Sequence, residues 1–322
     1  DKFTQHQRYW LDKYREVPEP LLTRRYAAQF AGQVIPSQRS ILHLQRSLYN
    51  QLIQFARANN ASTFHVILGV LYCYFVRTSN RKDVVIGLPT LNRSTATFRQ
   101  TVGLFAGMIP VWFRFGIELN FVKLIQAIKG ELQKNYRYQR FPVSEINRQL
   151  GLHKQGHRQQ LFDIELSYMD NDYNTHFASS PVEMVGLHQG FEQNALLLYI
   201  NEFNDQHNVK LDFDYNFGTF NSDEIEYLKT RFEFLLGEAL RQPSTPIRAL
   251  QIMPDAELKK VLVEFNQTAT SYPLEKTIID LFEEQVDKTP EAIAVIFENQ
   301  QLTYQQLNAK ANQLAHYLVH LG

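Results

Sequence analysis

The chain has 322 residues, of which 44% are hydrophobic and 13% aromatic, so it can form one to three domains with a large core. Lys plus Arg and Asp plus Glu both total 33, so the net charge gives no reason to expect nucleic acid or an anionic membrane surface as a partner. There is no signal-peptide pattern, no apolar stretch near the roughly 18 residues of a membrane span and only one cysteine, Cys73, which together predict a cytoplasmic protein without disulfides.

The first half of the chain shows alternating helix and strand patterns. Thr63 has the residue type of an N-cap, and Cys73 lies in the apolar helix that follows, where we interpret it as a core residue and not as a nucleophile. A polar loop is expected over residues 92–100. The patterns predict helices over 48–59, 63–76 and 121–139, and strands over 83–87 and 108–115.

The alternation continues to a pair of prolines at residues 243–246, where we expect the first domain to end. A loop is predicted over 151–160, and Ser222 has the residue type of an N-cap. Alternating helices and strands favour a layered α/β fold. The predicted elements are strands over 162–168, 195–203 and 209–215, and a helix over 223–240.

The last part of the chain has a pattern of its own. Apolar spacing predicts a helix over 278–286, a strand over 292–297, a polar turn at 299–300 and a second helix after Tyr304. One strand and two helices cannot bury a core by themselves, so this part either docks on the preceding domain or is the start of a larger domain.

This region resembles the beginning of the adenylation domains of nonribosomal peptide synthetases, which activate amino acids as adenylates. The strand pattern is matched by Thr289, Pro290, Ala292, Ala294, Val295 and Phe297, and the first box of the family is matched by Leu302, Thr303, Tyr304 and Leu307. An ordinary strand and helix would explain the apolar positions but not the whole ordered set. The resemblance implies ATP and Mg as ligands of a complete adenylation domain, and it implies that Leu302, Thr303 and Tyr304 are packing residues.

The preceding residues resemble the second half of a condensation domain of the same synthetases. Residues 83–93 are similar to a VIGxPxxNR stretch, and residues 101–111 to a VGxFVNTxPxR box in which Ala106, Gly107 and Met108 replace Val, Asn and Thr. Residues 138–145 and 161–168 are similar to two later boxes, the first with Tyr138 in place of His. The resemblance implies an α/β, chloramphenicol-acetyltransferase-like sandwich at 1–246, an interdomain linker at 247–276 with a short helix, and an adenylation fragment at 277–322.

The family's catalytic motif, His-His-x-x-x-Asp-Gly, has no match here, because none of the ten histidines has a histidine neighbour. Residues 3–11 resemble the segment that follows this motif. We therefore predict no catalytic residue and no metal site within these 322 residues, and interpret His65, His153 and His157 as structural or solvated. The chain is expected to be an inactive fragment of a synthetase that transfers an acyl or peptidyl group to an aminoacyl thioester, with phosphopantetheine on partner carrier domains.

Five residues are candidates for lining or supporting the substrate tunnel that the resemblance implies: Arg93, Gly103, Gly107, Tyr138 and Gln139. In the family an arginine at the position of Arg93 pairs with the aspartate of the His motif; a surface arginine is the alternative. The two glycines either let the backbone pass close to a substrate or form a strand bulge.

Two alternatives to an elongating enzyme stay open. Tyr168, Asp170, Asp172, Tyr173 and the segments 190–194 and 212–216 resemble starter-type condensation domains, which join an acyl group to the first amino acid. A non-catalytic condensation-like scaffold that docks neighbouring or carrier domains is the second alternative. A free-standing acyltransferase would also need the His motif and would not explain the adenylation start.

Overall fold

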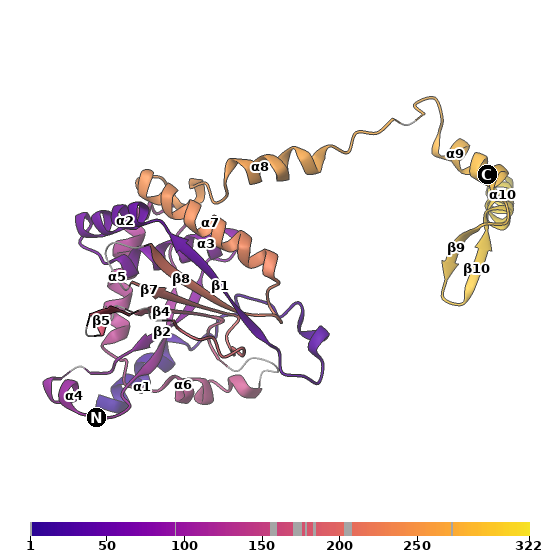
Figure 1. Ribbon diagram of the computed structural model, residues 1–322. Helices are drawn as coiled ribbons and strands as arrows, with labels where there is room; N and C mark the ends of the chain where they lie inside the picture. Colours follow the sequence, from indigo (N-terminus) through magenta and orange to yellow (C-terminus); the bar gives the residue numbers. More distant parts are fainter. Residues whose placement is uncertain are drawn as a thin grey trace. The chain divides into compact units, whose positions relative to one another are not determined.

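The structure is a computed structural model that describes residues 2–93, 95–154, 160–169, 176–177, 179–182, 185–202, 208–271 and 273–322. The chain divides into two compact units, Asp1–Leu258 and Lys259–Gly322. Figure 1 labels the helices and strands of both units, and each unit is described by itself.

The first unit is built around helix α3 (Thr63–Ser79), whose residues from Val66 to Val76 are all buried. Its first turn is fixed by a capping box, in which Ser62 accepts from the backbone N–H of His65 and the His65 ring accepts from the backbone N–H of Ser62. The N-cap is therefore Ser62, whereas the sequence pattern predicted Thr63. His65 has the structural role that we predicted for it.

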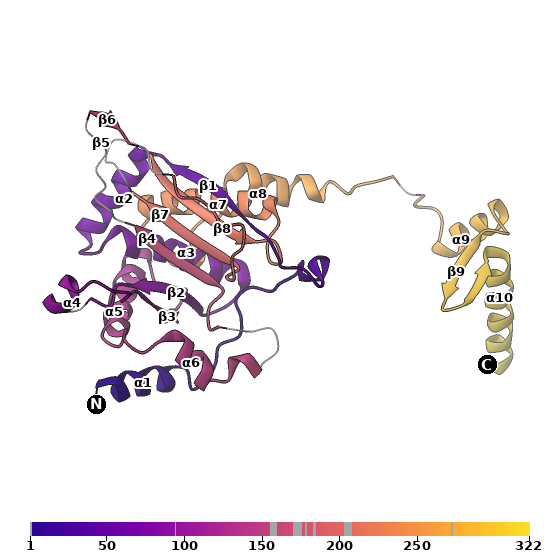
Figure 2. The same cartoon turned by 60° about the horizontal axis from the view of Figure 1, so that its bottom comes forward.

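A mixed sheet of six strands lies against α3, in the order β1-β8-β7-β4-β2-β3 (Figure 2). The pairings of β4 with its two neighbours, β2 and β7, are parallel, and the other three pairings are antiparallel. This arrangement confirms the predicted α/β class. The strands are β1 (Ser37–Leu44), β2 (Val84–Thr90), β3 (Gly107–Phe113), β4 (Ile164–Met169), β7 (Leu196–Asn201) and β8 (Val209–Asn216).

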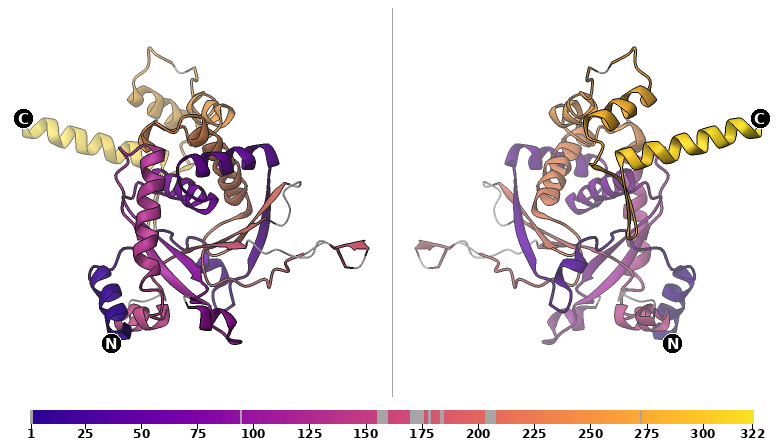
Figure 3. Two further views of the ribbon diagram at one scale, coloured as in Figure 1. Left: turned by 90° about the vertical axis from the view of Figure 1, so that its left-hand side faces the viewer. Right: turned by 90° about the vertical axis from the view of Figure 1, so that its right-hand side faces the viewer.

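Helices cover one face of this sheet, as Figure 3 shows. Alongside α3 these are α2 (Arg46–Ala58), α5 (Phe121–Tyr136) and α7 (Ser222–Arg241), which pack on α3 with buried apolar stripes. Asn221, and not Ser222, caps α7, because its side chain accepts from Glu224 N–H while the Glu224 carboxylate accepts from Asn221 N–H. Ser222 is thus the first helical residue.

β3 forms one edge of the sheet, and α1 (Lys2–Lys13) and α6 (Val143–Gln149) lie beside it. Trp10 of α1 is fully buried and donates its indole N–H to the Tyr138 carbonyl at 2.9 Å, and Tyr14 stacks on Trp112 at 5.4 Å. Aromatic packing of this kind fixes α1 on the sheet edge.

The sequence patterns missed α1, β1, α4 (Ala96–Gln100), α6 and the second strand of the C-terminal hairpin. α4 lies inside the loop predicted at 92–100, where the Thr95 side chain caps it. The other described elements are short: η1 (Ala27–Phe30), η2 (Leu152–Lys154), β5 (His176–Phe177), β6 (Ser180–Pro181), η3 (Ile247–Ala249) and η4 (Glu264–Asn266).

Beyond the predicted boundary at residue 246 the chain stays in contact with the first unit for some residues. Ile247 is fully buried and donates its N–H to Leu119 O at 2.8 Å. The short helix expected from the resemblance is α8 (Asp255–Leu262). The exact limits of the linker stay a prediction, and Tyr272 within it lies outside the described residues.

The second unit contains α9 (Ile278–Lys288), a hairpin of β9 (Ile293–Phe297) and β10 (Gln300–Thr303), and α10 (Tyr304–Leu321). Capping boxes at Thr277 and Thr303 begin the two helices. The two strands are joined by a turn at residues 298–299, one residue earlier than the predicted 299–300, because residues 300–303 pair with β9 as a strand. Large apolar side chains such as Phe297 (69% exposed) and Val319 (81%) stay outside any core, in agreement with the prediction that this part cannot bury one.

In the described part of the chain, no single helix is long and apolar enough to cross a membrane. The pair α2 and α3, bent by 104° at its break, meets the length and composition test only as a pair.

Candidate functional site

The loop that joins β2 to β3 contains two of the predicted site residues, Arg93 and Gly103, and a third, Gly107, begins β3. Arg93 follows β2, and its guanidinium donates to the carbonyl oxygens of Phe98, Thr101 (2.6 Å) and Gly103 (2.9 Å). The guanidinium also lies over the ring of Phe105, 4.4 Å from its centroid. Arg93 therefore holds this loop together, and its pairing with an aspartate of the His motif stays a prediction.

Gly103 in this loop and Gly107 at the start of β3 occupy places that a larger residue would fit only with strain. A Cβ at Gly107 would lie 2.6 Å from Nδ2 of Asn92, and Gly103 has a φ of +153°. Beside Gly107, the side-chain oxygens Oγ1 of Thr90 and Oδ1 of Asn92 are buried and have no hydrogen-bond partner among the described residues. A buried polar atom without a partner costs about 1–3 kcal/mol, so a ligand group or an ordered water at this strand end would stabilise it.

Tyr138 and Gln139 lie in the turn after α5, and both are half-buried. The Tyr138 ring stacks on Tyr9 at 3.9 Å between centroids, with 11° between the ring planes. The neighbouring Arg140 lies 4.9 Å above the ring of Phe98, which connects this turn to the β2–β3 loop. The structure thus brings all five predicted residues to one end of the sheet, and it gives Tyr138 a packing role against α1.

The face of the sheet away from the helices carries a polar cluster that the sequence analysis did not identify as a site. In β8, apolar side chains face the helices, and Asp212 and Asp214 alternate with them on the other face. Arg39 of β1 donates to both oxygens of Asp214, at 2.6 and 2.7 Å, and lies 3.3 Å from Asp212. The Arg39 side chain is 15% exposed and that of Asp214 only 1%, so this is a buried, bidentate ion pair.

His188 and Glu192 approach the same aspartate from the segment that crosses β1 and β8. His188 Nε2 lies 3.9 Å from Asp214 Oδ2 and 3.3 Å from Ser37 Oγ. One ligand atom from each of His188, Glu192 and Asp214 lies within 4.8 Å of the others, the spacing of a metal site. Both oxygens of Asp214 already accept from Arg39, however, so the group fits an arginine-centred ion cluster better than a metal centre.

Glu165 of β4 is the titratable member of this polar face. Burial raises its pKa to about 7, the neighbouring Glu192 adds to the rise, and a 2.9 Å hydrogen bond from Asn194 opposes it. The pKa of Glu192 is also raised, chiefly by burial. A carboxyl group with such a pKa can accept or release a proton near neutral pH.

A half-buried carboxylate lies at the carboxyl ends of the parallel strands β4 and β7. Glu202 accepts hydrogen bonds from Tyr49 (2.5 Å) and Tyr168 (2.7 Å), and Arg46 lies 3.5 Å from its other oxygen. Burial is the main cause that raises the pKa of both phenols, so they remain protonated donors. This cluster fixes α2 to the sheet.

The four adenylation-box residues lie in the second unit and serve its packing. Thr303 caps α10, the Tyr304 ring lies 6.0 Å from that of Phe282, and Leu302 and Leu307 are half-buried.

Comparison with known families explains this arrangement. Residues 1–262 match the family model described as condensation domain. The chain belongs to the condensation-domain family. Residues 282–322 match the model described as AMP-binding enzyme, so the condensation domain is followed by the start of an adenylation domain, as the resemblance implied.

Relatives of this condensation domain are large synthetases. Bacitracin synthase 2 of Bacillus licheniformis is 29% identical over 328 residues, which cover 98% of this chain and 12% of that protein. Tyrocidine synthase 3 of Brevibacillus parabrevis is 27% identical over 325 residues, 99% of this chain and 5% of that protein. The dimodular nonribosomal peptide synthase of Bacillus subtilis (strain 168) is 27% identical over 322 residues, 100% of this chain and 13% of that protein. The chain thus spans 5–13% of the length of these relatives, and it is part of a nonribosomal peptide synthetase.

Solved structures show the same fold. The first condensation domain of the calcium-dependent antibiotic synthetase aligns with a TM-score of 0.64 and 17% identity over 79% of this chain and 54% of that chain. A mutant of the starter condensation domain of rhizomide synthetase, in complex with C8-CoA and Leu-SNAC, aligns with a TM-score of 0.62 and 22% identity. This alignment covers 79% of this chain and 55% of that chain. The structure of a four-domain nonribosomal peptide synthetase bound to AMP and glycine aligns with a TM-score of 0.69 and 16% identity. This alignment covers 100% of this chain and 25% of that chain.

The two segments that resemble starter condensation domains come together on the polar face. Asn216 donates to the Glu192 carbonyl at 2.8 Å. Asp170, Asp172 and Tyr173, which belong to the same resemblance, lie outside the described residues. The signal for the polar face was in the sequence as aspartates alternating with apolar residues in β8, but the partner Arg39 comes from a strand that no pattern predicted.

Proposed function

We propose that this condensation domain forms an amide by transferring an acyl or peptidyl group from a carrier-bound thioester to the amine of an aminoacyl thioester. The observation that carries the proposal is the order of the two family matches, condensation at 1–262 and AMP-binding at 282–322, in one chain. The partners in this reaction are carrier domains, whose phosphopantetheine arms hold both substrates, and the remaining parts of the two domains.

The role of these residues in the reaction is support and positioning. The 322 residues contain no adjacent histidine pair, so the His motif that acts on the amine is supplied from outside them, and the chain alone is inactive. The β2–β3 loop, held by Arg93, and the strand end at Gly107 form the wall of the substrate tunnel, with Tyr138 and Gln139 supporting it. Correct placement of amine and carbonyl is itself a large part of catalysis of this kind.

A starter-type donor is the narrower form of this proposal. It is supported by the contact between the segments 190–194 and 212–216, which resemble starter domains. The synthetase would then join an acyl group to its first amino acid, in the cytoplasm, without a nucleic-acid or membrane partner.

The adenylation start contributes no nucleotide-binding group of its own. ATP and Mg bind to a complete adenylation domain, to residues other than Leu302, Thr303, Tyr304 and Leu307, whose side chains pack or cap in this structure. Residues 277–322 thus supply the first helices and strands of that domain.

The test uses the natural gene product that contains these residues. Its intact mass and peptide map identify the sequence before residue 1, and mass spectrometry then follows amide formation between loaded carrier domains. We expect amide product in the natural protein, a loss of about tenfold or more in Arg93→Ala, and no change in the exposed-site control Arg57→Ala. Amino-acid-dependent ATP–pyrophosphate exchange verifies that the adenylation domain is intact in each variant.

A non-catalytic scaffold predicts a different outcome. If the natural protein carries no His-His-x-x-x-Asp-Gly peptide and forms no amide while the adenylation activity is normal, the docking role replaces the catalytic one.

A further inference from the structure

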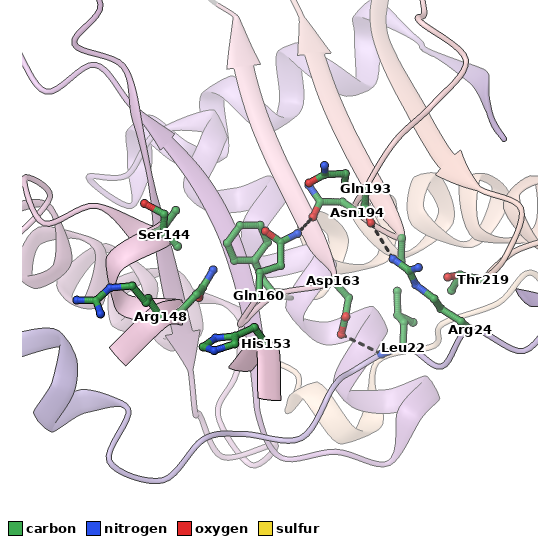
Figure 4. A pocket seen from close by; sticks show the side chains of 14 residues that line it. Leu22, Arg24, Ser144, Arg148, His153, Gln160, Asp163, Gln193, Asn194 and Thr219 are labelled. Atoms are coloured by element: carbon green, nitrogen blue, oxygen red, sulfur yellow. Dashed lines mark hydrogen bonds between the residues drawn. The ribbon is translucent and has the colours of Figure 1, made fainter. Parts of the chain in front are cut away.

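A polar cavity of about 420 Å³ opens at the edge of the first unit, away from the β2–β3 loop. Its walls come from the segment after α1, from α6 and from the ends of β4, β7 and β8 (Figure 4). Arg148, Ser144 and His153 lie on one side of it, and Arg24 and Thr219 on the other. Nothing in the proposed condensation reaction uses these residues.

Two side chains in the cavity wall have hydrogen-bonding atoms without partners among the described residues. These atoms are Oγ1 of Thr219 and Oδ1 of Asn147, and both are buried. Thr219 is only 2% exposed, so bulk solvent does not satisfy its hydroxyl. A buried hydroxyl that lines a cavity and has no partner favours a ligand in that cavity.

The charge beside Thr219 comes from Arg24. The two are close because Tyr26 N–H donates to Gly218 O at 2.9 Å, which places the segment 24–26 along residues 218–219. Arg24 donates to the carbonyl of Gln193 at 3.1 Å, and no carboxylate lies within ion-pair distance of it in the described part of the chain. Its guanidinium therefore keeps donors for an incoming anion.

The acidic groups of the cavity are already engaged. Asp163 accepts the backbone N–H groups of Leu21 (2.7 Å) and Leu22 (3.2 Å). Glu145, next to the cavity, is bound by both ends of the Arg148 guanidinium, at 2.9 and 2.5 Å. Arg148 is thus neutralised by Glu145, which leaves Arg24 as the arginine of the cavity without an ion pair among the described residues, while Asp163 is held by backbone donors beside Leu22.

We propose that this cavity binds a small organic oxyanion, a carboxylate or a phosphate, whose charged oxygens accept from Arg24 and Thr219. A guanidinium and a hydroxyl together are a common arrangement for such groups. The polar remainder of the ligand lies towards Asn147, which accepts a hydrogen bond from it. The site is independent of the condensation chemistry.

Binding is measured with inorganic phosphate and with acetate as probes, by thermal unfolding of the 322-residue chain at constant ionic strength set with chloride. Trp10 and Trp112 are both buried in the unit that contains the cavity, so their fluorescence reports its unfolding. A ligand that binds only the folded state raises the unfolding temperature in a saturable way, from which its dissociation constant follows. Each variant is compared with its own anion-free baseline.

We expect saturable stabilisation by at least one probe, and the stronger probe identifies the phosphate or the carboxylate source. Arg24→Gln weakens binding by about tenfold or more, and Thr219→Val, which keeps the volume but removes the hydroxyl, also weakens it. Arg15→Gln removes an equal charge from an exposed position and leaves binding unchanged. Stabilisation that never saturates, or that is equal in Arg24→Gln and Arg15→Gln, would overturn the proposal.

Discussion

Replacing Arg39 by methionine removes the centre of the polar face while keeping most of the side-chain volume. Asp214 is 1% exposed and Asp212 7%, so the substitution leaves two carboxylates buried without their cation. Removal of one partner from a buried ion pair costs about 3–5 kcal/mol. This is a large part of the roughly 5–15 kcal/mol by which a domain is stable, so Arg39→Met should fold only marginally at neutral pH.

The assay is urea unfolding followed by tryptophan fluorescence, which reports the first unit. A loss of 3–5 kcal/mol moves the midpoint by roughly 1–2 M urea when the slope is about 2–3 kcal/mol/M. Adding Asp214→Asn should recover part of this loss, because the two sites are coupled.

The control for this experiment is Arg25→Met, which breaks a surface pair with Glu224. Arg25 is 54% exposed, so this loss should stay below about 1 kcal/mol. If Arg39→Met costs no more than Arg25→Met at pH 7, the reasoning that the polar face is an energetically coupled, buried cluster is wrong.

Three further predictions concern single residues. Gly87→Ala should cost about 1–3 kcal/mol by urea unfolding, because the new Cβ would lie 2.7 Å from Cδ2 of Phe162; an unchanged midpoint would refute this contact. The pKa of Glu165 is about 7 in the folded state, above its unfolded value, so ionisation of Glu165 lowers the stability of the fold as the pH rises from about 4.5 to 7. Glu165→Gln should therefore be more stable than the parent at pH 8 but not at pH 4. A stability difference that does not depend on pH would contradict this. Arg93→Ala should speed amide hydrogen exchange in residues 98–105 with little change in the unfolding midpoint, and unchanged exchange would show that Arg93 does not hold the loop.

Local patterns predicted the regular elements best where the apolar periodicity was strong. The helices at α3, α5 and α7 and the strands at β4, β7 and β8 were all expected, with limits that differ by a few residues. The cap positions were shifted by one residue at α3 and α7, because adjacent Ser, Thr and Asn side chains all suit an N-cap and only the backbone turn selects one.

The missed elements depend on contacts that are distant in the sequence. β1 reads as a mixture of polar and apolar residues because Arg39 faces the polar side of the sheet while Ser40 bonds to Glu226 and Lys229 of α7 on the other side. It forms a strand by pairing with β8. α1 has few apolar residues, and aromatic contacts of Trp10 and Tyr14 hold it at the sheet edge. β10 exists because it pairs with β9.

The sequence by itself determined the family and the α/β class, since ordered boxes and apolar periodicity are properties of neighbouring residues. It also placed Arg93, Gly103, Gly107, Tyr138 and Gln139 in the boxes that carry the resemblance. Only the tertiary structure decided which side chains meet. The ion cluster on the polar face and the cavity between α6 and the sheet both combine residues that lie more than a hundred positions apart in the chain. Arg39 meets Asp214 in the cluster, and Arg24 meets Gln193 in the cavity wall. A buried charge is stable only beside its partner, and the sheet order that places those partners together is set by long-range strand pairing, on which local patterns carry no information.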